Sequence, residues 1–360
     1  MASKRIRVAI AGLGNCAASL IQGVYYYRNK TEGTIPGLMH VNFGGYLPRD
    51  IEFVAAFEVN KLKIGKDISE AILVDPNCAR KICDVPQLGV KVMPGPISDG
   101  VAPHMVEPFH CYDPNEMEPV DVAEVLRTAK ADMLINYLPV GSHDGARVYA
   151  QAALDAGCAY VNCIPEFIAS DPEWAKKFED ANLPVAGDDI KSQLGATILH
   201  RIIADLFVKR GIELEETYQL NIGGNTDFLN MTDEDRLKTK RISKTEAVTS
   251  QVPYDIPVRI GPSDYVDFLG DKKICYIYAK GKKFGDMPVT INVKLAVEDS
   301  PNSAGVVIDA IRAVKIALDR GIAGPLISIS SYCFKHPPKQ FTDAEAYQLV
   351  EDFIQGKRDR

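Results

Sequence analysis

The chain of 360 residues is 46% hydrophobic and 25% charged, an ordinary globular composition that excludes extended disorder and predicts about two domains. Its net charge of −7 argues against a general nucleic-acid footprint, so an anionic ligand would need a local cluster of lysine or arginine. No apolar run approaches the roughly 20 residues of a membrane span, and the N-terminus enters an apolar strand without a cleavable signal pattern. We therefore expect no membrane attachment.

The eight cysteines and six histidines show no spacing typical of a metal site. Neither C-x-x-C nor H-x-x-x-H occurs, so the sequence gives no support for mononuclear zinc catalysis. Scattered cysteines are typical of reduced thiols in a reducing compartment. We therefore expect a cytoplasmic protein.

The first element is a predicted buried strand over residues 6–11, followed by a turn and a helix. The turn reads G-x-G-x-x-A, the dinucleotide-binding fingerprint, in which Gly12 permits the tight turn and Gly14 lets a pyrophosphate approach the backbone. Ala17 supplies the small third position, and Asn15 and Cys16 lie at the helix N-terminus, which favours phosphate binding. The alternative is a glycine-rich turn of purely structural value.

A second apolar strand covers residues 53–57 and ends at Glu58. The acidic residue of a dinucleotide site normally comes about 20 positions after the fingerprint, and Glu58 comes much later. We interpret the polar, Gly- and Pro-rich residues 29–50 as an insertion before this strand. Glu58 would then accept hydrogen bonds from ribose hydroxyls and repel a 2′-phosphate, which favours NAD over NADP; otherwise it is an ordinary solvated strand end.

Further apolar strands over residues 133–138, 159–163 and 183–187 alternate with helices, one of them over residues 144–156. This alternation predicts an α/β fold, a Rossmann-like doubly wound parallel sheet covered on both faces. The last strand leads into Gly-Asp-Asp-Ile-Lys-Ser at residues 187–192. Carboxylates and a lysine at the carboxyl end of a strand favour a ligand site, although Asp and Ser there could simply cap a helix.

The pattern changes after about residue 215. Residues 274–278 and 289–297 alternate with period two, which predicts an antiparallel sheet with one covered face. Helical periodicity returns at residues 304–319 and 343–354. We therefore predict a dinucleotide-binding domain of residues 1–200 and 301–360, with an inserted α+β domain of residues 201–300 for catalysis and oligomerisation.

Several polar segments of the second half are candidates for a phosphorylated substrate and for proton transfer. A run of basic residues is usually a solvated helix face, so spacing alone does not show that these segments meet. The segments are Asn225 to Asn230, the basic residues Arg236, Lys238, Lys240, Arg241 and Lys244, and the runs 261–264, 271–273 and 299–302.

Together these segments resemble the myo-inositol-1-phosphate synthase family in its shorter prokaryotic form, over nearly the whole chain. The combination of segments is specific to this family, although no single segment is. The resemblance implies that the insertion before the strand ending at Glu58 is a feature of the family. Many relatives carry Asp where this chain has Glu58. The matching segments are residues 8–17, 36–40, 53–57, 136–142, 187–192, 220–225, 242–244 and 299–303.

The resemblance implies a redox-neutral, NAD-dependent conversion of glucose 6-phosphate to inositol phosphate by C5 oxidation, intramolecular aldol cyclisation and reduction. It also implies a homotetramer assembled through the inserted domain. The implied catalytic residues are Lys191, Lys244 and Lys273, with Asp264 and Asp299 as their partners. The implied NAD contacts beyond the fingerprint and Glu58 are Asp67, Ala129, Tyr149, Asp189, Ser192, Asp227 and Lys240.

Two other functions stay open. One is an NAD-dependent sugar or amino-acid dehydrogenase with the same two-domain plan, which would release reduced cofactor. The other is a non-catalytic NAD-binding regulator, which would need the fingerprint but not the lysines.

Overall fold

Seven parallel strands form the first sheet of the protein, whose computed structural model describes residues 4–261 and 264–360. The strand order is β3-β2-β1-β4-β5-β6-β12, the doubly wound order, with its switch point between β1 and β4. This order confirms the predicted Rossmann-like fold. The strands are β1 (Ile6–Ala11), β2 (Ile51–Glu58), β3 (Val92–Pro94), β4 (Met133–Asn136), β5 (Ala159–Asn162), β6 (Pro184–Ala186) and β12 (Gly324–Pro325).

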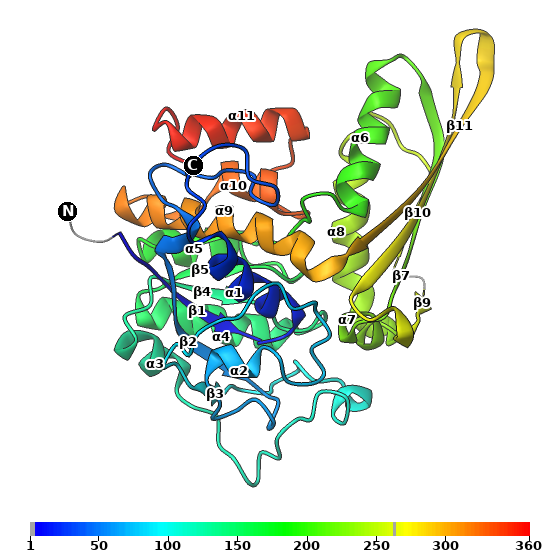
Figure 1. Ribbon diagram of the computed structural model, residues 1–360. Helices are drawn as coiled ribbons and strands as arrows, with labels where there is room; N and C mark the ends of the chain where they lie inside the picture. The colour runs from blue at the N-terminus through cyan, green and yellow to red at the C-terminus, as the bar shows by residue number, and fades with distance from the viewer. Residues whose placement is uncertain (1–3, 262–263) are drawn as a thin grey trace.

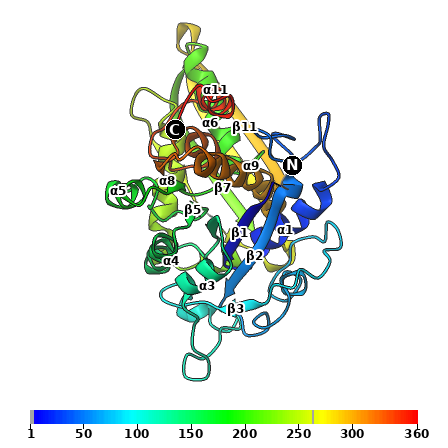
Figure 2. The same ribbon diagram turned by 90° about the vertical axis from the view of Figure 1, so that its left-hand side faces the viewer.

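Helices cover both faces of this sheet (Figures 1 and 2). Successive side chains of a strand point to opposite faces, so Val8 and Ile10 enter the core beneath α1 and α9, while Ala9 and Ala11 enter the core beneath α3, α4 and α5. Both faces are dry, which explains the nearly continuous apolar runs of the strands. The helices of this unit are α1 (Asn15–Tyr27), α2 (Ile68–Ala71), α3 (Val122–Thr128), α4 (His143–Ala156), α5 (Pro172–Asp180), α9 (Asp299–Asp319), α10 (Ile327–Cys333) and α11 (Asp343–Ile354), with short 3-10 turns at Pro48–Asp50 and Pro103–Met105.

The segment between α1 and β2 is held against α9 by Arg312. This fully buried guanidinium donates hydrogen bonds to the carbonyl oxygens of His40 at 2.7 Å, Val41 at 3.0 Å and Tyr46 at 3.2 Å. Because the segment packs outside the sheet, β2 pairs directly with β1. Glu58 therefore ends β2 beside the turn after β1, as the insertion hypothesis requires.

A second sheet has the order β11-β10-β7-β8, with β9 also paired to β7. The three long strands are antiparallel as expected, but β8 and β9 pair with β7 in parallel, so the sheet is mixed. The period-two pattern reports only alternation and does not reveal strand direction. The elements are α6 (Ala196–Lys209), β7 (Glu213–Gly223), α7 (Thr226–Asn230), α8 (Lys238–Thr249), β8 (Val258–Ile260), β9 (Asp264–Tyr265), β10 (Lys272–Lys283) and β11 (Met287–Glu298), with 3-10 turns at Glu234–Leu237, Asp267–Leu269 and Phe284–Asp286.

Helices α6 and α8 lie between the second sheet and the first unit (Figure 1). They pack on one face of the sheet around Phe207, Val248 and Ile277. The first of these helices, α6, begins at Ala196, and the domain boundary at residue 201 stays a prediction. Within the described residues, no helix combines the length and the apolar character that crossing a membrane requires.

Candidate functional site

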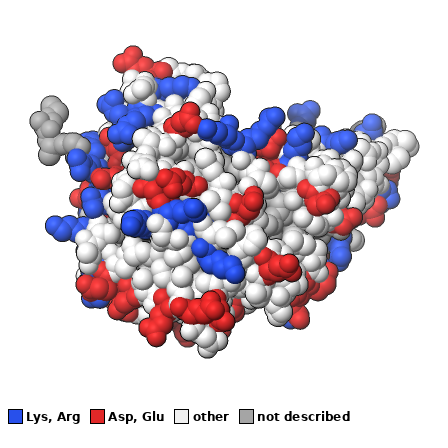
Figure 3. Space-filling model, turned by 60° about the horizontal axis from the view of Figure 1, so that its bottom comes forward, with Lys and Arg blue, Asp and Glu red and all other residues white. Residues whose placement is uncertain are grey.

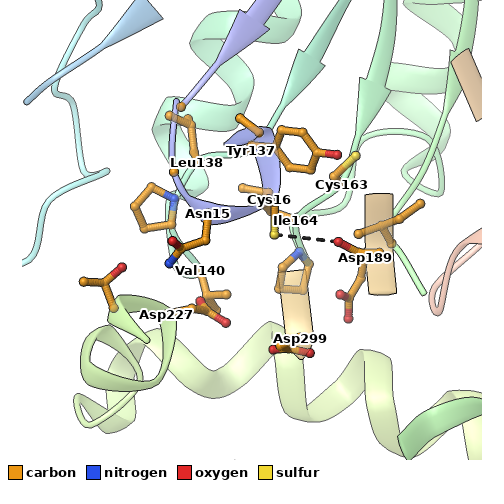
Figure 4. Close-up of a pocket in the computed structure, with 18 of the residues that line it drawn as sticks. Asn15, Cys16, Tyr137, Leu138, Val140, Cys163, Ile164, Asp189, Asp227 and Asp299 are labelled. Atoms are coloured by element: carbon orange, nitrogen blue, oxygen red, sulfur yellow. Dashed lines mark hydrogen bonds between the residues drawn. The ribbon is translucent and has the colours of Figure 1, made fainter. Parts of the chain in front are cut away.

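A cavity with about 240 Å³ of internal space lies where the two units meet. The loops after β1, β2 and β4 and the start of α9 line it from the first unit, and β7 and α8 line it from the second. Figure 4 shows Asn15 and Cys16 near the start of α1, with Asp227 and Asp299 across the cavity from Tyr137. The cavity therefore lies at the switch point of the first sheet, where open α/β sheets bind ligands.

The turn between β1 and α1 has the shape that a pyrophosphate needs. Gly12 has φ +88°, and a Cβ there would lie 2.6 Å from the Tyr137 carbonyl oxygen. A Cβ on Gly14 would meet no protein atom within 4 Å, so this residue faces open space. No side chain caps α1, which leaves its first N–H groups directed at the cavity. Glycine backbone, free N–H groups and a helix N-terminus fit a dinucleotide.

Asn15, Cys16 and Tyr149 also line this end of the cavity. The Asn15 side-chain oxygen accepts hydrogen bonds from the backbone N–H groups of Cys78 at 2.7 Å and Ala79 at 2.9 Å, which fixes that loop over the start of α1. Burial is the main cause that raises the pKa of the Cys16 thiol to about 12. Cys16 is therefore a neutral wall of the cavity.

Glu58 lies beside the same turn and lines the cavity. Its Oε2 accepts a hydrogen bond from the Leu13 N–H at 2.8 Å, and its Oε1 accepts one from the Val59 N–H at 2.8 Å. These bonds fix the carboxylate between β1 and β2, where the ribose of a dinucleotide is expected.

Four lysine ammonium groups converge on the cavity from the second unit and from the segment after α10. Three of them are paired with carboxylates that also line the cavity. The pairs are Lys240 Nζ with Asp227 Oδ2 at 2.8 Å, Lys273 Nζ with Asp299 Oδ1 at 3.0 Å and Lys335 Nζ with Asp189 Oδ1 at 2.7 Å. Burial alone would raise the pKa of Asp189, but the nearby ammonium groups of Lys335 and Lys240 lower it overall.

Lys244 is the fourth ammonium, and it differs from the other three. It is 5% exposed, and within residues 4–261 and 264–360 no side chain forms an ion pair or a hydrogen bond with it. Burial, followed by the charges of Lys240, Lys273 and Lys335, holds the pKa of Lys244 well below its ordinary value. A lysine in this state can act as a neutral amine or receive an anion.

Asp271 supports Asp299 from behind. The carboxylate of Asp271 accepts hydrogen bonds from Ser300 N at 3.1 Å and Ser300 Oγ at 2.8 Å, and its carbonyl oxygen accepts one from Asp299 N at 2.9 Å. Burial and the charge of Asp299 raise the pKa of Asp271 to about 6, although its hydrogen bonds oppose this. The start of α9 is thereby fixed so that Asp299 faces Lys273.

Lys191 was expected to be catalytic, but it is not among the residues that line the cavity. Its Nζ donates to the Ser331 carbonyl oxygen at 2.9 Å and pairs with Asp343 Oδ1 at 3.3 Å, on the side of α10 and α11. Ile190 and Ser192 line the cavity, and side chains alternate along extended backbone, so Lys191 points the other way. The sequence spacing correctly indicated that Lys191 follows a strand end, but it did not show that the Lys191 side chain points away from the cavity.

Three further predicted site residues lie outside the cavity lining. Asp264 is exposed, and its carboxylate accepts a hydrogen bond from the next backbone N–H. Asp67 caps α2 through Ser69 N and Ser69 Oγ, so its carboxylate is used locally. Ala129 ends α3, and its carbonyl oxygen accepts from Arg7. Asp189, Ser192, Asp227 and Lys240 do line the cavity, as do the fingerprint residues, Glu58 and Tyr149.

Lys335 is a cavity residue that the sequence reasoning missed. It reaches the site because the segment after α10 pairs with the segment after β6: Lys335 N donates to Asp189 O at 2.8 Å, and Lys191 N donates to Cys333 O at 2.8 Å. Its neighbours in the sequence form no recognisable motif. The only sequence feature that could have indicated this role is that Lys335 lies within residues 301–360, the part expected to return to the first domain.

Comparison with known proteins points to a single family. The family model described as myo-inositol-1-phosphate synthase matches residues 195–300. The chain is 55% identical to the inositol-3-phosphate synthase of Corynebacterium glutamicum, with 98% of this chain and 99% of that protein covered. It is 54% identical to the protein of the same name from Mycobacterium tuberculosis, with 99% of this chain and 97% of that protein covered.

A solved structure agrees with these sequence relatives. It is that of a myo-inositol-1-phosphate synthase-related protein from Thermotoga maritima, which is 26% identical with a TM-score of 0.79. The match covers 98% of this chain and 98% of that one, so it includes both sheets.

Proposed function

Because the chain belongs to the myo-inositol-1-phosphate synthase family, we propose that it converts D-glucose 6-phosphate to 1L-myo-inositol 1-phosphate, also named 1D-myo-inositol 3-phosphate. The reaction is an isomerisation in three parts: oxidation at C5, intramolecular aldol closure between C6 and C1, and reduction at C5. The observation that carries this proposal is the buried Lys244, which has no ion-pair partner among the described residues and lies with three further lysines beside a dinucleotide-shaped turn.

The proposed cofactor is NAD, which when bound would accept a hydride from C5 and later return it. The turn at Gly12 and Gly14, with the N-terminus of α1, would hold its pyrophosphate, and Glu58 would hold its ribose. Tyr149 and Asp227 also line the cavity.

The lysine cluster suits a substrate that is a dianion. On the face shown in Figure 3, acidic and basic groups are interspersed, so no broad basic field covers this side. Lys240, Lys273 and Lys335 would therefore supply the positive charge for the phosphate and for the oxyanion that develops during the reaction. Each is held by its own carboxylate, so little reorganisation is needed when the substrate binds.

Lys244 is the proposed base. With its pKa lowered, its neutral Nζ can take the proton from C6 once the adjacent C5 carries a carbonyl group. The resulting enolate carries negative charge, which the neighbouring ammonium groups stabilise. Carbon–carbon bond formation between C6 and C1 then closes the ring, and the C1 oxygen gains a proton.

The proposal is tested by incubating the protein with glucose 6-phosphate and NAD⁺, identifying the product by NMR and following the absorbance of reduced cofactor. Inositol phosphate should form while NADH does not accumulate. NADH growing in step with substrate loss would instead identify a dehydrogenase. Cofactor binding without any turnover would identify a regulator.

The proposed assembly is a homotetramer formed through the second sheet. Its outer face carries apolar side chains in cross-strand pairs, Leu220 with Tyr276 and Tyr218 with Tyr278. Leu220 and Tyr276 are each 39% exposed, and Figure 1 shows α6 and α8 on the opposite face of β7 and β10. A second copy of the same face would bury them.

All eight cysteines are free thiols, which supports a cytoplasmic location.

A further inference from the structure

Another buried lysine, Lys63, lies at the other end of the cavity. Its side chain is 3% exposed and lines the cavity beside the fingerprint turn. Its Nζ donates hydrogen bonds to the Leu13 carbonyl oxygen at 2.9 Å and to Asn77 Oδ1 at 2.9 Å. Both acceptors are neutral, so they hold the ammonium in place without cancelling its charge.

The charge partner of Lys63 is Glu58. The distance from Lys63 Nζ to Glu58 Oε2 is 3.8 Å, too long for a hydrogen bond but short enough for a strong Coulomb interaction in a buried site. Burial lowers the pKa of Lys63, while the carboxylates of Glu58 and Asp75 oppose this effect. The cavity wall at the expected ribose therefore carries one negative and one positive charge side by side.

We propose that Lys63 and Glu58 form a charge pair that sets the choice between NAD and NADP. Glu58 rejects a 2′-phosphate, and Lys63 is the cation that would bind such a phosphate if the carboxylate were absent. This inference rests on the cofactor role proposed above. Lys63 would thereby contribute to the choice between NAD and NADP, although it is not a residue of the dinucleotide fingerprint.

The contacts of Glu58 and Lys63 support both of these roles. With Glu58 present, its carboxylate lines the cavity and lies 3.8 Å from the ammonium, so it compensates that charge while its oxygens accept the hydrogen bonds of Leu13 N and Val59 N. Without Glu58, the ammonium cannot withdraw into solvent, because it is buried and tied to Leu13 and Asn77. A buried cation that has lost the carboxylate paired with it, beside an open cavity, favours an anionic ligand group.

The test measures dissociation constants of NAD⁺ and NADP⁺ by calorimetry and uses their ratio as the readout. The ratio of the NADP⁺ constant to the NAD⁺ constant should fall about tenfold or more in E58S, the scale of one charge-assisted hydrogen bond. It should rise in K63Q, which keeps a hydrogen-bond donor but removes the charge. In E58S/K63Q the gain for NADP⁺ should disappear.

Lys61→Gln is the matched control, since Lys61 is exposed and lies outside the cavity lining, and its ratio should stay as in the wild type. If E58S does not fold, E58Q removes the same charge at nearly constant size. A purely structural Lys63 would change both constants equally and leave the ratio fixed, which would overturn the inference. Product formation by the wild type is measured separately, so a failure of the proposed reaction and a failure of this charge pair give different results.

Discussion

Burial disfavours the charged form of a lysine, and Lys244 lies buried in the site without an ion-pair partner among the described residues. We predict that Lys244→Ala leaves NAD⁺ binding nearly intact but lowers turnover by about 10²-fold or more, the scale of a lost acid–base or oxyanion group. Lys191→Met, a change in a buried lysine outside the cavity lining, should lower the free energy of unfolding by about 1–3 kcal/mol, because Ser331 and Asp343 lose a donor.

Measurements of turnover and of denaturant unfolding for both variants test whether Lys244 acts in catalysis and Lys191 in stability. The folded fraction of Lys191→Met should react at a near-normal rate, since Lys191 lies behind the cavity wall. A hundredfold loss of turnover in Lys191→Met at normal stability would restore its catalytic role. Near-normal turnover in Lys244→Ala would remove Lys244 from the mechanism.

Glu166 is a buried carboxyl group that joins the two units. It contacts His143 at the start of α4 and accepts a hydrogen bond from Thr239 Oγ1 of α8 at 3.1 Å. Burial is the main cause that raises its pKa from 4.5 to about 8, although the bond from Thr239 opposes this. Between these two pH values the folded state keeps a proton that the unfolded state has lost.

The stability that this proton contributes is complete below pH 4.5 and is lost as the pH rises through about 8. We therefore predict that the free energy of unfolding of the wild type falls across this window relative to that of Glu166→Gln, whose amide does not titrate. Denaturant unfolding at several pH values measures the difference. Parallel pH profiles for the two proteins would show that Glu166 ionises normally.

The turn between β1 and α1 offers a matched pair of glycines at the scale of an element. We predict that Gly12→Ala destabilises the fold by about 1–3 kcal/mol, because the residue has φ +88° and its new Cβ would strike the Tyr137 carbonyl oxygen. Gly14→Ala should keep stability within about 0.5 kcal/mol, since its Cβ meets no protein atom.

Gly14→Ala should nevertheless weaken NAD⁺ binding by about tenfold or more, because its methyl group enters the space proposed for the pyrophosphate. Thermal unfolding and calorimetric titration of the two variants separate these effects. Unchanged cofactor affinity in Gly14→Ala would argue against binding at this turn.

Elements with strong end signals were predictable from the sequence. The helix expected at residues 343–354 is α11, whose N-terminus is a capping box between Thr342 and Glu345. The helix expected at residues 144–156 is α4, which ends at Gly157 with φ +73°. Both boundaries depend on local hydrogen bonds and on glycine geometry, so they can be recognised without knowing the fold.

At the scale of the whole molecule, the outer face of the second sheet predicts the assembly. We expect Tyr276→Glu to dissociate the proposed tetramer, because it places a charge in the apolar cross-strand pair with Leu220. Light scattering gives the mass of each form at micromolar concentration. Val106→Asp, a similar change at an exposed residue of the first unit, is the control and should leave the mass unchanged. A monomeric wild type would refute the assembly.

The sequence by itself determined the Rossmann-like fold, the turn at Gly12 and Gly14 and the position of Glu58 at a strand end. These features depend on backbone conformation and on hydrophobic periodicity, which residues near one another in the chain specify. The segments that carry lysines and aspartates could also be named, because such residues stand out at predicted strand ends and turns.

Only the tertiary structure decided which of those side chains meet. It places Lys335 beside Asp189, directs Lys191 behind the cavity wall and leaves Asp264 exposed. The physical reason is that a site is assembled by contacts between segments distant in the chain, and that a shift of one residue along extended backbone reverses the side to which a side chain points.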